Sequence, residues 1–135
     1  MKVVLDTNAL ISATLWPNSS ARKTLLLLRG QEARFYTSKA ILEEYEQAIR
    51  RDFTEMIESL PGLIRDIMAI STLAEPSSRL HVVKEDPDDD KIIECAVAAG
   101  AEFIITYDSH LLKLREYGGI RILTPESMRR LLKQG

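Results

Sequence analysis

Short apolar runs alternate along the chain with segments in which apolar residues recur at helical spacing. A continuous apolar run that stops at turn-forming residues is typical of a buried strand in a parallel sheet. Such runs predict strands over residues 2–5, 33–37, 79–83, 103–105 and 120–123. Helical spacing and capping residues predict helices over residues 9–15, 21–28, 38–51, 54–73 with a break at 61–62, 86–99, 110–116 and 124–133.

Three of these helices begin with recognisable capping residues. Ser38 is a suitable N-cap, and Asp86 and Thr124 are each followed by a proline at the first helical position. The regular alternation of strands and helices favours a parallel sheet with helices on both faces. We therefore expect one α/β domain over residues 1–135, a three-layer α/β/α sandwich whose mostly parallel, flavodoxin-like sheet has four to five strands.

Two of the predicted strands run directly into an aspartate. The first strand ends at Asp6, and the strand over residues 103–105 continues through Thr106 and Tyr107 to Asp108. Open α/β sheets bind their ligands at the carboxyl ends of the strands. The sequence thus predicts that Asp6 and Asp108 face one crevice.

A third acid is expected to reach this crevice from a helix. Asp89 shares one helical face with Ile93 and Ala96, so it points the same way as the buried stripe. An acid on an apolar face is costly unless it is paired or coordinates something. Capping of the helix accounts for only one or two of the four aspartates at residues 86–90.

Composition restricts the class of protein to which this crevice belongs. A length of 135 residues with 45% hydrophobic and 28% charged residues describes one ordinary globular domain. No apolar stretch approaches the roughly 18 residues needed to span a membrane, and without a signal-peptide pattern a cytoplasmic location is expected. Cys95, the single cysteine, excludes an internal disulfide and is expected to be a buried thiol.

The net charge of −2 conceals two oppositely charged segments. Residues 85–102 have a strong excess of acids, whereas residues 111–135 have an excess of lysine and arginine. An acidic centre with a basic flank is suited to holding a metal ion beside a phosphate backbone. Two ordinary solvated faces explain the same charge pattern, so charge alone does not choose between the two interpretations.

Carboxylates that share a crevice repel one another unless cations lie between them. Hard divalent ions such as Mg²⁺ and Mn²⁺ prefer oxygen ligands, whereas zinc sites favour Cys and His. Metals in such a site activate water for attack on a phosphodiester. Residues able to orient the ligands or the water are Thr7, Asn8, Thr106, Ser109 and Asp90.

Four segments in order resemble the motifs of the PIN-domain nucleases. They are Val4-Leu5-Asp6-Thr7-Asn8, Leu42-Glu43-Glu44-Tyr45, Asp86-Pro87-Asp88-Asp89 with its helix, and Ile105-Thr106-Tyr107-Asp108. The resemblance covers essentially the whole chain. It implies an α/β/α sandwich and Mg²⁺- or Mn²⁺-dependent cleavage of RNA. It also implies similarity to the ribonuclease toxins of prokaryotic toxin–antitoxin modules, which are usually homodimers inhibited by a protein antitoxin.

Carried over onto this chain, the resemblance assigns the catalytic and metal-binding acids to Asp6, Glu44, Asp89 and Asp108. Glu44 is chosen over Glu43 because it precedes Tyr45 directly. Asp89 is chosen over its neighbour Asp90 for its helical spacing to Ala96. The choice between Glu43 and Glu44 and that between Asp89 and Asp90 both remain open. Tyr107 stands where the family commonly has a small residue, which is expected to narrow the crevice.

Two other functions are compatible with parts of the pattern. A non-catalytic RNA- or protein-binding module would keep the fold and bind through basic residues, for which the candidates are Arg50, Arg51, Lys113, Arg115, Arg129 and Arg130. A phosphate-transfer or receiver-like domain would need a lysine late in the chain. Residues 122–125 lack it, which makes this alternative the poorest.

Overall fold

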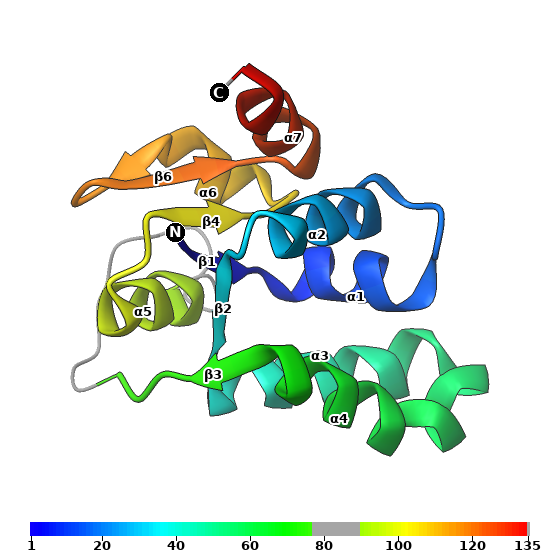
Figure 1. The fold of residues 1–135 in the computed structure, drawn as a ribbon. Coiled ribbons are helices and arrows are strands. Elements are labelled where there is room, and N and C mark those ends of the chain that lie inside the picture. Colours follow the sequence, from blue (N-terminus) through cyan, green and yellow to red (C-terminus); the bar gives the residue numbers. More distant parts are fainter. Residues whose placement is uncertain (77–89, 135) are drawn as a thin grey trace.

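The centre of the computed structural model, which describes residues 1–76 and 90–134, is a six-stranded, mostly parallel sheet (Figure 1). The strands are β1 (Lys2–Leu5), β2 (Arg34–Thr37), β3 (Ser71–Leu73), β4 (Phe103–Ile105), β5 (Glu116–Tyr117) and β6 (Ile120–Leu123). Their order is β3-β2-β1-β4-β6-β5, and β5 is the strand that pairs antiparallel. Helices flank the sheet, so the predicted α/β fold class is confirmed. The sheet has six strands and not the four to five predicted, because the short edge strands β3 and β5 were not expected.

The order of the strands places β1 in the middle of the sheet, between β2 and β4. In the flavodoxin order the first strand is flanked by the second and third, whereas here β3 lies beyond β2 at an edge. The register aligns Leu5 with Ile105, and the main-chain nitrogen of Asp6 donates to Ile105 O over 2.9 Å. The residues that follow β1 and β4 therefore emerge side by side at one edge of the sheet.

The helices are α1 (Thr7–Leu15), α2 (Ser20–Gly30), α3 (Lys39–Asp52), the 3₁₀ helix η1 (Thr54–Ser59), α4 (Leu60–Ile70), α5 (Asp90–Ala99), α6 (Ser109–Leu114) and α7 (Pro125–Gln134). Two of the predicted caps are confirmed. Ser38 Oγ accepts from the main-chain nitrogen of Ile41 over 3.2 Å, and Thr124 Oγ1 accepts from that of Ser127 over 3.1 Å.

The predicted segment 54–73 contains two shorter helices, η1 and α4, as expected, but the break lies between residues 59 and 60 and the helical part ends at residue 70. Pro61 does not interrupt a helix but lies in the first turn of α4, where its missing N–H leaves no hydrogen bond unmade. Residues 71–73 (Ser-Thr-Leu) form the edge strand β3, because they pair in parallel with residues 35–37 of β2; their local sequence is not a buried apolar run. The strand predicted over residues 79–83 and the helix start at Asp86 lie outside the described residues.

Helix packing buries both sides of the central strands. α5 packs against β1, β2 and β4, α6 packs against β6, and α2 contacts both α1 and α7. Val3, Val4 and Ile104 are fully enclosed, and Cys95 is a buried free thiol as predicted. Among the residues described, no helix is both long and apolar enough to cross a membrane.

Candidate metal-binding site

Asp6 lies at the point where β1 passes into α1, and its side chain is 4% exposed. The apolar run of β1 ends here because Asp6 serves as the N-cap of α1. Its Oδ1 accepts a 2.6 Å hydrogen bond from the main-chain nitrogen of Thr7. The carboxylate is thus fixed at the carboxyl edge of the sheet by the same contact that starts the helix.

Thr106 connects Asp6 to the fourth motif. Its side chain is fully buried, and its hydroxyl donates a 2.5 Å hydrogen bond to Asp6 Oδ2. The Thr106 hydroxyl oxygen in turn accepts a hydrogen bond from the main-chain nitrogen of Asp108 over 2.9 Å. The main-chain nitrogen of Thr106 donates to Leu123 O, which ties this turn to β6. A continuous chain of hydrogen bonds therefore runs from the Asp6 carboxylate to Asp108.

Asp108 caps the short helix α6. Its Oδ1 accepts from the main-chain nitrogens of His110 and Leu111 over 2.9 and 3.1 Å. His110 Nδ1 lies 4.0 Å from the same oxygen, an ion pair only when the imidazole is protonated. Sequence reasoning gave His110 no role, although its place two residues after Asp108 could have drawn attention to it.

The hydroxyl of Thr7 is the second polar group of interest beside Asp6. Thr7 is 3% exposed, and its Oγ1 has no hydrogen-bond partner among the described residues. Buried hydroxyls are normally satisfied, so an unpartnered one indicates a place where water or a ligand atom would bind. Asn8, the next residue of the first motif, is exposed.

The second motif places its two glutamates differently on α3. Glu43 is exposed, whereas Glu44 is partly buried beside Tyr45, whose hydroxyl lies 2.8 Å from that of Thr14 on α1. Asp52 raises the pKa of the Arg51 guanidinium, and Glu44 adds to this effect. Burial thus favours Glu44 as the glutamate that faces the interior.

The third motif is described only from Asp90 onward. Asp89, the predicted ligand, lies outside the described residues. Asp90 is the first residue of α5 and is 5% exposed, which is unusual for an acid. α5 is followed by β4, which begins at the amino edge of the parallel sheet. The first residue of α5 therefore lies toward the carboxyl edge, which holds Asp6. This burial is consistent with the supporting role expected of Asp90.

The donor atoms at this edge of the sheet are of the kind that a hard divalent cation prefers. Asp6 and Asp108 supply carboxylate oxygens, and Thr7 supplies an unpartnered hydroxyl. Mg²⁺ typically binds one or two carboxylates together with water and phosphate. Within residues 1–76 and 90–134 no three His, Cys, Asp or Glu side chains are close enough to hold a metal ion, so these residues alone do not complete a site.

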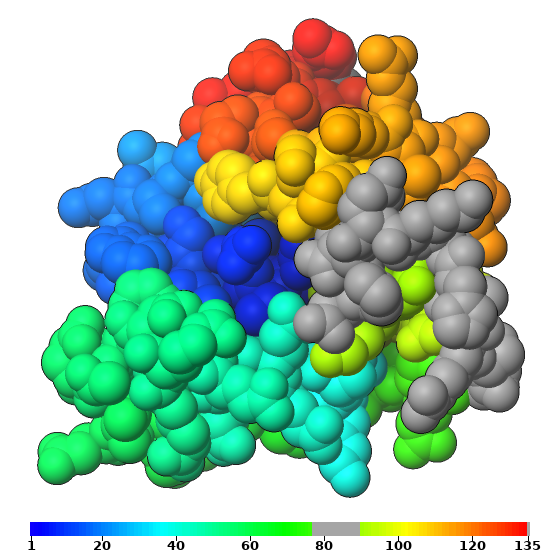
Figure 2. All heavy atoms as spheres, turned by 180° about the vertical axis from the view of Figure 1, so that it is seen from behind, coloured from blue at the N-terminus to red at the C-terminus, as the bar shows by residue number. Residues whose placement is uncertain are grey.

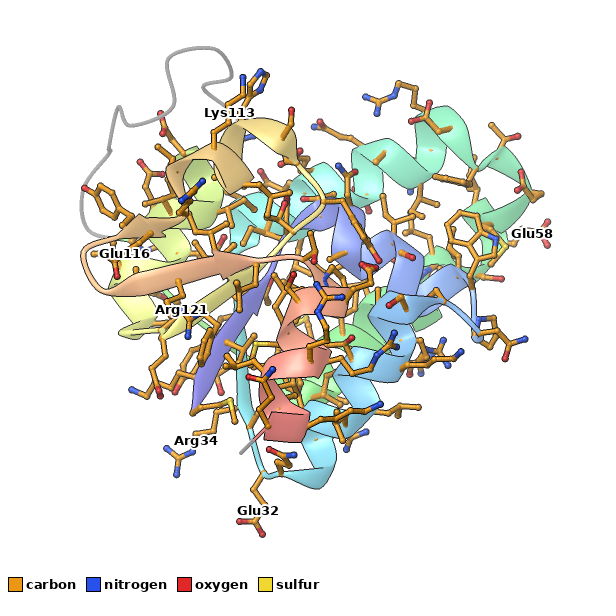
Figure 3. All side chains as sticks on the ribbon, turned by 90° about the horizontal axis from the view of Figure 1, so that it is seen from above. Glu32, Arg34, Glu58, Lys113, Glu116 and Arg121 are labelled. Atoms are coloured by element: carbon orange, nitrogen blue, oxygen red, sulfur yellow. The ribbon has the colours of Figure 1, made fainter. Side chains whose placement is uncertain are left out.

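The predicted nucleic-acid-binding residues form two separate groups. Arg50 and Arg51 end α3, where Arg50 lies 3.9 Å from Glu46 and Arg51 is paired with Asp52 over 2.9 Å. Lys113 projects outward from α6, as Figure 3 shows, and Arg115 is exposed just after this helix. The first pair thus belongs to α3, and the second to α6 and the residue that follows it.

Comparison with known proteins agrees with the fold and the motifs. The PIN domain family matches residues 2–110. The uncharacterized protein MJ1680 of Methanocaldococcus jannaschii is 32% identical over 120 residues, which are 86% of this chain and 76% of that protein. The crystal structure of VapBC2 from Rickettsia felis bound to a promoter DNA fragment is similar with a TM-score of 0.65 and 16% identity, over 90% of this chain and 97% of that one. The chain belongs to the PIN domain family.

Proposed function

We propose that this protein is a metal-dependent endoribonuclease that hydrolyses phosphodiester bonds of RNA. The observation that carries the proposal is the buried hydrogen-bond chain from Asp6 through Thr106 to Asp108. It fixes the Asp6 carboxylate and the main chain of Asp108 at the edge of a parallel sheet where ligands bind, and the Asp108 carboxylate is fixed there by capping α6. Membership of a family whose members are generally nucleases supports the same conclusion.

Each residue of the site would have a distinct task. Asp6 and Asp108 hold the cation, Mg²⁺ or Mn²⁺, and Glu44 and Asp89 complete the acidic set. Thr106 fixes the orientation of the Asp6 carboxylate, and the Thr7 hydroxyl binds a water or a ligand oxygen. When bound, the cation supplies an activated water and stabilises the leaving oxygen of the phosphodiester.

We further propose that the protein is the toxin of a toxin–antitoxin module, a cytoplasmic homodimer that a protein antitoxin inhibits. The similarity to VapBC2 supports this assignment. A hollow of about 240 Å³ lies between α1, α2 and α4 and is a surface suited to a protein partner. Its lining is mainly aliphatic, with Leu26 and Ile67, and also includes Arg22, Arg29 and Asp66.

The first experiment is a cleavage assay on end-labelled RNAs and single-stranded DNAs with Mn²⁺, Mg²⁺ or EDTA. Wild-type protein should cleave RNA only with metal, and Asp6→Asn should abolish cleavage while the fold is retained. Cleavage that persists in Asp6→Asn would show that the site is wrong. Folded wild-type protein that binds RNA without metal and cleaves nothing would favour a non-catalytic binding module instead.

A further inference from the structure

Tyr107 brings an aromatic ring to the surface within the turn that carries the site. It lies between fully buried Thr106 and Asp108, yet 39% of it is exposed. Large exposed aromatic side chains are frequent at binding surfaces. Figure 2 shows the residues that follow β4 (yellow) at the surface between the start of the chain (blue) and α7 (red). Because Tyr107 is the residue between Thr106 and Asp108, its exposed ring belongs to the same turn as the candidate site.

The ring of Tyr107 is held in place by α7. Its hydroxyl donates a 3.0 Å hydrogen bond to Glu126 Oε1 in the first turn of that helix. A ring whose orientation is already fixed loses little conformational entropy when it binds a partner.

Positive charge lies next to the ring. Arg129 lies three residues after Glu126, the hydrogen-bond partner of Tyr107, and so shares that face of α7. Arg130 is exposed, and Lys133 adds a further cation in the last turn. Surfaces that bind single-stranded nucleic acid combine aromatic rings, on which bases stack, with cations that contact the phosphates.

We infer that Tyr107 stacks on a base of single-stranded RNA next to the bond to be cleaved, with Arg129 and Arg130 contacting the adjacent phosphates. This inference rests on the proposed function and assigns to Tyr107 a part in substrate selection. It gives a reason for a large residue at this place: the ring reaches α7 and presents a stacking surface.

The test compares the binding of short RNA oligomers with that of an abasic ribose-phosphate oligomer of equal length. Binding is measured with Asp6→Asn protein in metal-free buffer, so that nothing is cleaved. Tyr107→Leu and Tyr107→Phe are introduced into this background. Trp16→Leu is the matched control, because Trp16 is also exposed, at 48%, and lies at the far end of α1. Circular dichroism and melting curves verify that each variant is folded.

Stacking predicts that Tyr107→Leu weakens binding of base-bearing RNA by about fivefold or more and leaves the abasic oligomer unaffected. Tyr107→Phe should keep most of the affinity, and Trp16→Leu all of it. Unchanged affinity in Tyr107→Leu, or an equal loss on the abasic oligomer, overturns the inference alone. If Tyr107→Leu does not fold, the test uses the Asp6→Asn protein that keeps Tyr107. Equal binding of the base-bearing and the abasic oligomer by that protein overturns the inference. If that protein binds no RNA at all, the proposed function fails as well.

Discussion

The Thr106 hydroxyl donates a 2.5 Å hydrogen bond to Asp6 Oδ2, although the two residues are 100 positions apart in the chain. The contact exists because β1 and β4 are neighbours whose registers place Leu5 opposite Ile105. It satisfies a buried carboxylate oxygen, and the same hydroxyl accepts from the Asp108 main chain. The Thr106 side chain thus contacts both the Asp6 carboxylate and the main chain of Asp108.

Replacing Thr106 with valine should lower the stability of the protein. Valine keeps the shape but removes the donor to Asp6 and the acceptor for the main-chain nitrogen of Asp108. We expect a loss of about 1–3 kcal/mol in the free energy of unfolding, since two buried polar groups lose partners. Denaturant unfolding measures it. Thr106→Ser, which keeps the hydroxyl, is the control, and equal losses in both variants would show that the hydroxyl is not the cause.

Substitutions of Asp108 can separate its role as the cap of α6 from the role of its negative charge in metal binding. Asparagine can still accept from the main-chain nitrogens of His110 and Leu111, whereas alanine cannot. Asp108→Ala should therefore lower stability by about 1 kcal/mol, and Asp108→Asn by much less. Both should abolish metal-dependent cleavage. Full activity of Asp108→Asn would mean that Asp108 is only a helix cap.

The two glutamates of the second motif provide a matched pair. Glu44 is partly buried and Glu43 exposed, so substitution to glutamine should affect them differently. We expect Glu44→Gln to reduce the cleavage rate by more than about tenfold and Glu43→Gln to leave it unchanged. Single-turnover cleavage at saturating Mn²⁺ measures both. The opposite ranking would assign the role to Glu43.

Cys95 should be inert toward thiol reagents in the folded protein. Burial raises the pKa of its thiol from 9.0 to about 12, and a hydrogen bond with Ser38 opposes this only in part. The thiol then remains protonated, and its contribution to stability is present below pH 9 and is lost as pH rises toward 12. Reaction with a disulfide reagent at neutral pH should be slower by about 100-fold or more than in denaturant. Rapid labelling of native protein would contradict this.

Sequence reasoning predicted β1, β2, β4 and β6, the caps at Ser38 and Thr124, and the edge of the sheet that holds Asp6 and Asp108, but it missed the edge strands β3 and β5. The predicted features follow from local rules, because buried parallel strands are continuous apolar runs and their carboxyl ends meet. The bond from Thr106 to Asp6 was beyond reach, since it depends on the register of two distant strands. The contact of Tyr107 with Glu126 was missed for a similar reason, as it depends on where α7 returns to the sheet.

The central claim is that Asp6 and Asp108 belong to one divalent-cation site. Electron paramagnetic resonance of Mn²⁺ tests it directly, because binding removes the signal of the free ion. The wild-type protein should bind Mn²⁺, and Asp6→Asn and Asp108→Asn should each weaken binding by about tenfold or more, with Glu43→Gln unchanged. Wild-type protein that binds no Mn²⁺, or variants that bind it equally well, would contradict the account.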